Sequence, residues 1–387
     1  CRAKGTGDSS VKITRIELTN FRNICQAELE PEDGLTVIFG KNGQGKTNLL
    51  EAIWLLTGAK SFRGAKDAEL IQRQQPFSII RAEIESRDIE KEIQISICPP
   101  GSPKPGRTAK VSGVDQGRAS NLAGLFRAVV FEPNHLSLVK GSPEGRRKFV
   151  DSALCQLYPG YLAEYRRYLQ VLSQKNALLK HYRRTPGAAE MLDIYDEQMA
   201  QAAQKITKRR QDYIATLAPL ATQNYANISH GAEKLEIAYI PTAPQGNLQE
   251  ILRNNRKEDL RCGFCTVGPH REDISIFING QPARTDASQG QQRSAVLSLK
   301  LAEATMIEQI TQEHPVMLLD DVLSELDEGR QQYLLSRMEG KQIFVSGCDG
   351  TMFRKTRGKM FHMEQGTLKP WKKGELDVSS SGAAYSD

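Results

Sequence analysis

The feature that most constrains the fold is the stretch VIFGKNGQGKT at residues 37–47. It places an apolar strand before a glycine loop and a helix over about 46–56, and the loop fits G-x-x-x-x-G-K-[ST]. The glycines let backbone N–H groups converge on phosphate oxygens, and the helix N-terminus attracts the same anion. Lys46 is expected to bind the β- and γ-phosphates and Thr47 to bind Mg²⁺. The predicted ATP-binding residues here are Gly40, Lys41, Asn42, Gly43, Gln44, Gly45, Lys46, Thr47 and Asn48.

A second apolar stretch, Val316–Leu319, ends in Asp320 and Asp321. Ligands bind at the carboxyl ends of strands in α/β sheets, so Asp320 is expected beside the glycine loop, holding Mg²⁺ with Thr47. Asp321 is placed to orient or activate the attacking water. The predicted catalytic residues are Lys46, Asp320 and Asp321. An apolar strand ending in Asp is common, so this prediction depends on the glycine loop.

The pattern along the chain predicts an α/β fold, with a mixed sheet around the glycine loop and an inserted lobe of long antiparallel helices. Helical periodicity runs from Ser142 to about Ser229 and is broken by Pro186-Gly187. We therefore predict an N-terminal ATPase part over 11–140, a helical lobe over 141–265 and a C-terminal ATPase part over 266–368. Strands are expected over 11–18, 35–39, 77–85, 90–97, 128–131, 235–239, 273–278, 316–319 and 342–345, and further helices over 249–260 and 288–310.

Composition describes an ordinary globular chain of 387 residues, with 39% hydrophobic residues and a net charge of +6. This charge permits nucleic-acid binding without establishing it. No run approaches the ~18 apolar residues of a membrane span, and residues 1–10 lack the apolar segment of a secretory signal. Seven scattered cysteines fit a reducing cytosol. We expect a cytoplasmic protein without a membrane partner, with disordered tails at 1–10 and 369–387.

Three features allow both a structural and a functional interpretation. Cys262 and Cys265 form a lone C-x-x-C, and because structural zinc needs about four ligands we favour two ordinary thiols in a turn. For His270 we favour a structural loop histidine over a catalytic one. A basic group on the second long helix is either a solvated face or a set of DNA contacts: Lys205, Lys208, Arg209 and Arg210.

A third motif precedes the acidic strand. Ser288-Gln289-Gly290-Gln291-Gln292 opens a predicted helix, with Ser288 as a suitable N-cap. Together with the glycine loop, this motif resembles the signature of the ATP-binding-cassette superfamily. In that superfamily the signature of one subunit closes over the nucleotide of another. Ser324-Glu325-Leu326-Asp327 resembles the D-loop, which crosses that dimer interface.

Within this superfamily the chain resembles the RecF family of bacterial recombination-repair ATPases. The resemblance rests on TNFRN at 19–23, KSFR at 60–63, the motif GQGKTNLLEAI at 43–53 and VGPHRED at 267–273, although Glu272 stands where Asp is expected. The helical segment between the glycine loop and the signature is longer than in a transporter ATPase. It is shorter than the coiled coil of a structural-maintenance-of-chromosomes (SMC) protein.

The resemblance implies a weak DNA-dependent ATPase with ATP and Mg²⁺ as cofactors. An ATP-dependent homodimer would clamp double-stranded and gapped DNA, cooperate with RecO and RecR, and open on slow hydrolysis. A bacterial, nucleoid-associated location follows. Arg22 and Asn23 are expected to line the nucleotide, and Arg63, Arg146 and Arg147 are the candidate DNA contacts. Glu132 is a candidate for the position of the Gln loop.

Two alternatives remain open at this point. One is a chromosome-organising SMC-like ATPase, although the chain lacks a hinge-bearing coiled coil. The other is the ATPase subunit of a membrane transporter. Against this second alternative, Ser346-Gly347-Cys348-Asp349 follows the last predicted strand, where a transporter ATPase carries its switch histidine.

Overall fold

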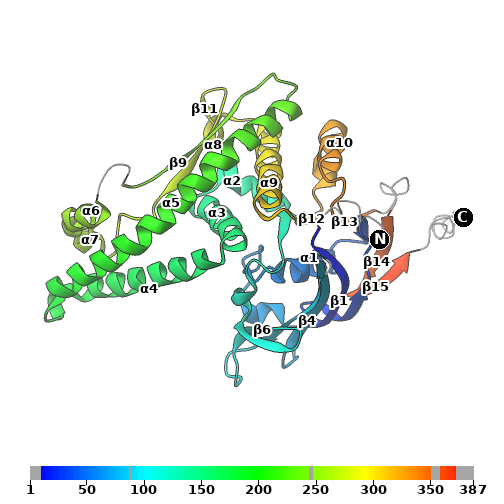
Figure 1. The fold of residues 1–387 in the computed structure, drawn as a ribbon, viewed down its shortest axis with the longest axis horizontal. Helices are drawn as coiled ribbons and strands as arrows, with labels where there is room; N and C mark the ends of the chain where they lie inside the picture. Colours follow the sequence, from blue (N-terminus) through cyan, green and yellow to red (C-terminus); the bar gives the residue numbers. More distant parts are fainter. Residues whose placement is uncertain (1–9, 88, 244–246, 350–357, 372–387) are drawn as a thin grey trace, which may run out of the picture. The chain divides into compact units, whose positions relative to one another are not determined.

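The computed structural model describes residues 10–87, 89–243, 247–349 and 358–371 (Figure 1). The chain divides into two compact units, residues 1–133 with 307–387, and residues 134–306. Most of both predicted tails lies outside the described residues. The second tail was predicted to begin too early, because residues 369–371 belong to a β-strand. No helix among the described residues is long and apolar enough to cross a membrane.

The first unit contains a six-stranded antiparallel sheet with the order β2-β1-β4-β5-β6-β7. The expected pairing of 77–85 with 90–97 is confirmed as β4 against β5. The strands are β1 (Lys12–Phe21), β2 (Ile24–Leu29), β4 (Ser78–Ser86), β5 (Ile89–Cys98), β6 (Gly106–Val111) and β7 (Val114–Arg118).

The second sheet of this unit has the order β15-β14-β3-β13-β12-β8 and contains the strand before the glycine loop. The contacts of β3 with β13 and β14, and of β12 with β13 and β8, are parallel. The carboxyl ends of β3 and β12 therefore lie at one edge of the sheet, on either side of β13. The strands are β3 (Leu35–Phe39), β8 (Ala128–Phe131), β12 (Val316–Asp320), β13 (Ile343–Gly347), β14 (Gly358–Glu364) and β15 (Thr367–Trp371).

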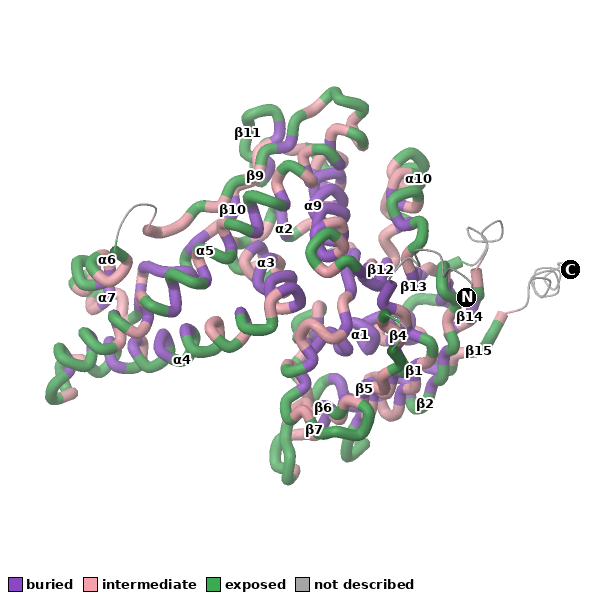
Figure 2. The backbone as a smooth tube through the Cα atoms, viewed as in Figure 1, coloured by how far each residue is buried: buried purple, intermediate pink, exposed green. Residues whose placement is uncertain are grey.

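The core of the first unit is built on helix α1 (Lys46–Leu55), which follows the glycine loop. Its Leu50 and Ile53 are fully buried in one cluster with Ile80 of β4 and Leu318 of β12, so both sheets contribute to this core. Figure 2 shows that most of α1 is buried, and the buried run covers Leu49–Leu55. Helix α10 (Glu328–Ser336) follows the acidic strand after a short turn.

The second unit is mostly helical, and its two longest helices, α4 and α5, lie side by side (Figure 1). Gly187, with φ of 69°, ends the turn between them, as Pro186-Gly187 predicts. The helices are α2 (Ser137–Lys140), α3 (Pro143–Leu157), α4 (Pro159–His181), α5 (Ala188–Ile228), α6 (Leu248–Asn254), α7 (Arg256–Cys262) and α8 (Ala283–Asp286). Helix α9 (Gln289–Thr311) contains the boundary between the units.

The helical segment differs from the prediction in two places. The first of the two predicted long helices is two helices, α3 and α4, because Tyr158 precedes a proline and is extended, with φ of −131° and ψ of 92°. The single helix predicted over 249–260 is divided at Asn255 into α6 and α7.

The predicted boundary at residue 265 also differs from the observed division at residue 306. The physical reason is a small antiparallel sheet with the order β11-β10-β9. Strand β10 (Asp273–Ile278) pairs along its length with β9 (Leu235–Ile240), and β11 (Gln281–Pro282) completes the predicted hairpin. These pairings hold the segment after residue 265 in the second unit.

Candidate nucleotide site

The glycine loop runs from the end of β3 into α1, as the motif predicts. Gly43 and Gly45 have positive φ values of 79° and 117°. A Cβ at Gly45 would lie 2.9 Å from Oδ1 of Asn23, and a Cβ at Gly40 would lie 2.3 Å from the carbonyl oxygen of Met363. The loop therefore needs glycine at these positions for conformation and for space.

Lys46 is buried within this loop, with 6% of its surface exposed. Its Nζ donates to the carbonyl oxygen of Gly40 at 2.6 Å and to that of Lys41 at 3.1 Å. The ammonium group is thus held by carbonyl oxygens of the loop itself, in a loop of the kind that can bind a phosphate group.

The acidic strand lies beside the loop. Thr47 Oγ1 donates to Oδ1 of Asp320 at 2.9 Å, and Ser346 Oγ donates to the same oxygen at 2.7 Å. Burial raises the pKa of Asp320, while the hydrogen bonds from Ser346 and Thr47 act against this rise. A hydroxyl and a carboxylate oxygen this close together fit Mg²⁺, which prefers oxygen ligands.

Asp321 follows in the left-handed region, with φ of 55°. Its backbone N–H donates to Ser346 Oγ at 3.0 Å, so Ser346 joins both acidic residues. The Cys348 thiol donates to Asn42 Oδ1 at 3.0 Å, and its sulfur lies 3.8 Å from Oδ2 of Asp321. The chain after β13 therefore links the glycine loop to the acidic strand, where transporter ATPases carry a histidine.

A second group of side chains, outside the acidic strand, is connected to the glycine loop by hydrogen bonds. Asn23 Nδ2 donates to the Gly43 carbonyl at 3.2 Å, and Asn48 Nδ2 donates to Asn23 Oδ1 at 2.7 Å. Arg63 Nη1 donates to Asn48 Oδ1 at 2.9 Å, which places this candidate DNA contact next to the glycine loop.

Arg22 has a different environment from Asn23. Its Nε and Nη2 donate to Glu51 at 2.5 and 2.9 Å, and Glu51 is fully buried and also accepts from Ser61. The guanidinium is therefore anchored to α1 by an ion pair. Sequence reasoning assigned no role to Glu51, because nothing in the motif shows that its partner lies 29 residues upstream.

The turn between β14 and β15 also contacts the loop, and the sequence contained no signal for it. Gln365 N–H donates to Gln44 Oε1 at 2.6 Å, and Gly366 N–H donates to the Gln44 carbonyl at 2.9 Å. A Cβ at Gly366 would lie 2.2 Å from the Asn23 carbonyl oxygen, so glycine is needed there. This turn braces the glycine loop.

The signature-like motif lies in the second unit and begins α9. The Gln291 N–H donates to Ser288 Oγ at 3.2 Å, and the Ser288 N–H donates to Gln291 Oε1 at 2.7 Å. This reciprocal pair is a capping box and confirms Ser288 as the N-cap. Gln292 is buried and donates to the Ala287 carbonyl, whereas Ser288 and Gln289 are exposed.

The D-loop-like segment follows the acidic strand in the first unit. Ser324 is exposed and donates to the Asp321 carbonyl at 2.8 Å. Asp327 is exposed and caps α10 by accepting from the Arg330 N–H at 2.9 Å. Glu325 and Leu326 are half-buried between them. The segment is thus a turn fixed to Asp321 at one end and to a helix at the other.

The candidate DNA contacts in α3 need correction. Arg146 is buried and donates to both Asp273 carboxylate oxygens, at 2.7 and 2.9 Å, so its charge is used inside the unit. We therefore withdraw Arg146 as a DNA contact. Arg147 is half-buried and donates to the Glu272 carbonyl at 2.7 Å. Glu132, the Gln-loop candidate, is buried directly after β8.

The Gly-Pro-His-Arg segment is part of the interior of the second unit. His270 Nδ1 lies 2.5 Å from the Tyr168 hydroxyl, and its Nε2 lies 2.9 Å from the Cys265 carbonyl oxygen. Burial lowers the pKa of His270 to about 4, so the ring is neutral at physiological pH. These contacts support the structural role.

The thiols of the C-x-x-C stretch are free, and Cys265 is buried beside Lys175, whose Nζ lies 3.5 Å from its sulfur. Lys175 also pairs with Asp196 and Asp259 at 2.9 and 3.0 Å. Within the described part of the chain, no group of three or more His, Cys, Asp and Glu residues is arranged to hold a metal ion.

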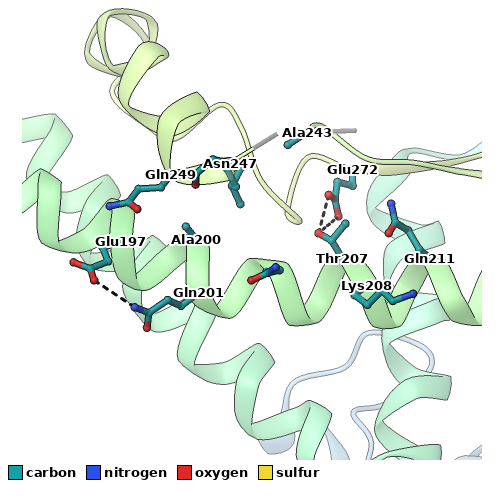
Figure 3. A pocket seen from close by; sticks show the side chains of 12 residues that line it. Glu197, Ala200, Gln201, Thr207, Lys208, Gln211, Ala243, Asn247, Gln249 and Glu272 are labelled. Carbon is teal, nitrogen blue, oxygen red and sulfur yellow. Dashed lines mark hydrogen bonds between the residues drawn. The ribbon is translucent and has the colours of Figure 1, made fainter. Parts of the chain in front are cut away.

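Two cavities flank α5. A cavity of about 730 Å³ lies beside Thr207, which donates to the buried Glu272 carboxylate at 2.9 Å (Figure 3). A second cavity of about 590 Å³ lies where α3 meets α4, lined in part by Tyr158 and by the basic residues Lys205, Lys208 and Arg209.

The four basic residues predicted on the second long helix, α5, differ in burial: one is buried and three line the second cavity. Arg210 is 1% exposed and donates to both Asp151 oxygens at 2.8 Å, so it is structural. Arg209 places its guanidinium carbon 4.6 Å from the Tyr158 ring centroid. Lys205 and Lys208 are exposed, although each also pairs with a carboxylate, Glu164 and Asp212 respectively.

The chain is similar to known proteins along most of its length. The sequence profile described as "RecF/RecN/SMC N terminal domain" matches residues 12–369. The "DNA replication and repair protein RecF" of Bacillus cereus (strain AH820) is 38% identical over 371 residues, covering 92% of this chain and 98% of the relative. A solved structure of the recombination mediator protein RecF with ATP is 34% identical, with a TM-score of 0.88, and covers 95% of this chain and 100% of the other.

The likeness extends in fold alone to an Smc head domain from Pyrococcus furiosus. That structure is 15% identical with a TM-score of 0.54, and the match covers 93% of this chain and 96% of the other. The predicted ATPase-head fold with an inserted helical lobe is thereby confirmed.

Proposed function

This chain belongs to the RecF family, and we propose that it is an ATP-binding protein of DNA replication and repair that acts as an ATP-dependent DNA clamp. The observation that supports this most directly is the 2.9 Å hydrogen bond between Thr47 and Asp320, which brings the two phosphate-site motifs together. The proposed location is the bacterial cytoplasm, associated with the nucleoid.

In the proposed site, the loop from Gly40 to Thr47 binds the phosphates of ATP through its backbone N–H groups and Lys46. Thr47 and Asp320 would hold Mg²⁺, which supplies charge neutralisation at the β- and γ-phosphates. Asp321 orients the attacking water. Its side chain is one methylene shorter than that of glutamate, so we expect slow hydrolysis.

The proposed dimer completes each site with the signature motif of a second copy. Ser288 and Gln289 are exposed, so they are accessible to the nucleotide bound by another molecule. Slow hydrolysis then opens the dimer. The rate of ATP hydrolysis would then set how long the clamp stays closed.

The clamp is proposed to bind duplex and gapped DNA through phosphate contacts, with little sequence readout. With Arg146 buried, Lys205, Lys208 and Arg209 on α5 join Arg63 and Arg147 as the candidate contacts. We propose that the clamp acts at single-strand/double-strand junctions and helps RecO and RecR to load recombinase. The support for these partners is membership of the family.

The test is an electrophoretic mobility shift with gapped, duplex and single-stranded DNA, with and without ATP. Lys46→Ala should abolish ATP-dependent binding to gapped DNA, and binding that persists unchanged in the presence of ATP would refute the clamp. Asp321→Asn should accumulate an ATP-bound dimer. Light scattering that still shows monomers would contradict the proposed order of dimerisation and hydrolysis.

A further inference from the structure

The loop between α5 and β9 carries a carboxylate that contacts both the long helix and the signature motif. The Tyr225 hydroxyl, in the last turn of α5, donates to Oε2 of Glu233 at 2.7 Å. Gln291 Nε2, in the signature motif, donates to Oε1 of Glu233 at 2.6 Å. Each carboxylate oxygen thus has its own donor, and Glu233 bridges two elements of the second unit.

Gln291 in turn orders the start of α9. Its Oε1 accepts from the Ser288 N–H at 2.7 Å, while its amide nitrogen faces Glu233. A primary amide has donors only on its nitrogen, and an ionised carboxylate can only accept. Glu233 therefore selects one of the two amide orientations, the one that presents an acceptor to Ser288. With the amide reversed, two donors would face each other at the helix start.

The backbone next to Glu233 is held in place by hydrogen bonds. The Lys234 N–H donates to Asn279 Oδ1 at 2.8 Å, and the Asn279 N–H donates to the Lys234 carbonyl at 2.9 Å. Further along the same two helices, Asn224 Nδ2 of α5 donates to the Ser298 carbonyl of α9 at 3.3 Å. Because its backbone is fixed in this way, Glu233 can hold the Gln291 side chain in one geometry.

We propose that Glu233 is a positioning residue for the nucleotide site of a second copy of this chain. It orients Gln291, which holds the Ser288 N–H, and so fixes the helix start that presents the exposed Ser288 hydroxyl to the nucleotide bound by that copy. This proposal rests on the proposed function, in which the signature motif acts in trans. It also gives the end of α5 a direct hydrogen-bonded connection to the signature motif, on the same helix that carries Lys205, Lys208 and Arg209.

The first test compares Glu233→Ala with wild type in steady-state ATP hydrolysis. Loss of two hydrogen bonds to a carboxylate should lower kcat about tenfold. The affinity of the monomer for ATP should not change, because the glycine loop lies in the other unit. Glu233→Gln keeps an acceptor oxygen for Gln291 and should restore kcat to within about threefold of wild type. A wild-type kcat for Glu233→Ala would overturn the proposal.

Glu236→Ala is the matched control. Glu236 lies three residues away, is exposed and pairs only with Lys234 at 2.6 Å among the described interactions. This variant should behave as wild type. An equal loss of kcat in Glu236→Ala would mean that loss of any carboxylate near the start of β9, and not loss of the bridge through Glu233, lowers the activity, and this would overturn the proposal.

The second test uses mixed dimers to show that Glu233 acts in trans. A dimer of one Glu233→Ala chain and one Lys46→Ala chain contains one site with an intact glycine loop and an intact signature motif. Mixing the two variants should therefore raise ATP hydrolysis well above the sum of the separate rates. If mixing Ser288→Ala with Lys46→Ala restores activity and mixing Glu233→Ala does not, Glu233 does not act through the signature motif.

A third measurement separates this proposal from the proposed function. Amide hydrogen exchange of the monomer without ATP should be faster at residues 288–292 in Glu233→Ala than in wild type or Glu236→Ala. Unchanged exchange there would overturn the positioning role, whatever the activity. If wild type neither dimerises nor hydrolyses ATP, the proposed function fails, and exchange still decides whether Glu233 orders the motif.

Discussion

Thr47 and Asp320 are 273 residues apart in the chain, and their side chains are joined by a hydrogen bond of 2.9 Å. Thr47 is the last residue of the glycine-loop motif, and Asp320 is the last residue of β12. Strand β13 lies between β12 and β3, the strand that leads into the glycine loop, and its Ser346 donates to the same carboxylate oxygen. Three adjacent parallel strands thus converge on one carboxylate.

Asp320→Asn should therefore impair Mg²⁺-dependent hydrolysis while leaving the fold intact. The amide keeps an acceptor for Thr47 and Ser346 but removes the charge that attracts the cation. We expect a loss of about 3 kcal/mol of transition-state stabilisation, or about 100-fold in kcat. Titrating Mg²⁺ at saturating ATP measures this effect. A wild-type Mg²⁺ dependence in Asp320→Asn would contradict the assignment.

Arg146→Ala should destabilise the protein through loss of a buried ion pair. Removal of the guanidinium leaves the Asp273 carboxylate without its cationic partner, and it takes a donor away from the carbonyls of Leu138 and Gly141. We expect the free energy of unfolding to fall by about 3 kcal/mol, measured by urea denaturation. The control is Lys148→Ala, since Lys148 and Glu144 form an exposed pair and the expected loss is below about 1 kcal/mol. Equal losses in both variants would refute the buried role.

His270 should make the protein less stable in acid. Burial lowers its pKa to about 4, whereas an unfolded histidine titrates near 6.5. Between these values the unfolded chain binds more protons, so the free energy of unfolding decreases as the pH falls through this window. The gap corresponds to about 3 kcal/mol at most, all of it present above pH 6.5 and lost near pH 4.

The measurement is urea denaturation of wild type and His270→Gln between pH 7 and pH 4. The stability advantage of wild type over the variant should shrink by about 2–3 kcal/mol on acidification. His181→Gln, at an exposed site in α4, controls for the loss of a histidine as such. Parallel pH profiles for wild type and His270→Gln would contradict the prediction.

Cys348 should make ATP binding sensitive to thiol alkylation. Its thiol is exposed and lies against Asn42 and Asp321, so an attached N-ethylmaleimide group would occupy the space beside the glycine loop. Treatment should weaken ATP binding about tenfold or more, and Cys348→Ser should be resistant. Cys25 is also exposed, and Cys25→Ser should remain sensitive. If Cys25→Ser were resistant to N-ethylmaleimide, the reactive thiol would be Cys25 and the prediction for Cys348 would be wrong.

Much of the first unit could be predicted because its signals are local. The glycine loop, the strand before it and the helix after it are contiguous in the chain, and Val316–Asp320 is a fully buried strand, as its composition indicates. The reciprocal bond between Ser288 and Gln291 is likewise local, and the N-cap prediction was correct.

The contacts that the sequence did not reveal are long-range or depend on burial. Gln365 reaches Gln44 across 321 residues, and no pattern in either segment encodes that pairing. Arg146 looked like a surface cation because its partner, Asp273, is 127 residues away in the small sheet. The position of that sheet also explains the error at the domain boundary, since β9 and β10 pair across a segment that was expected to separate two lobes.

The contact of the β14–β15 turn with the glycine loop has a consequence for the synthesis of the protein. Strand β3 is made early, yet both of its sheet neighbours, β13 and β14, and the turn that holds Gln44 come from beyond residue 342. Through most of translation, the glycine loop of a ribosome-bound chain therefore lacks its contacts with β13, β14 and the β14–β15 turn. The loop can gain these contacts only after nearly all of the described chain has been made. We therefore expect nascent chains to bind nucleotide more weakly than finished molecules.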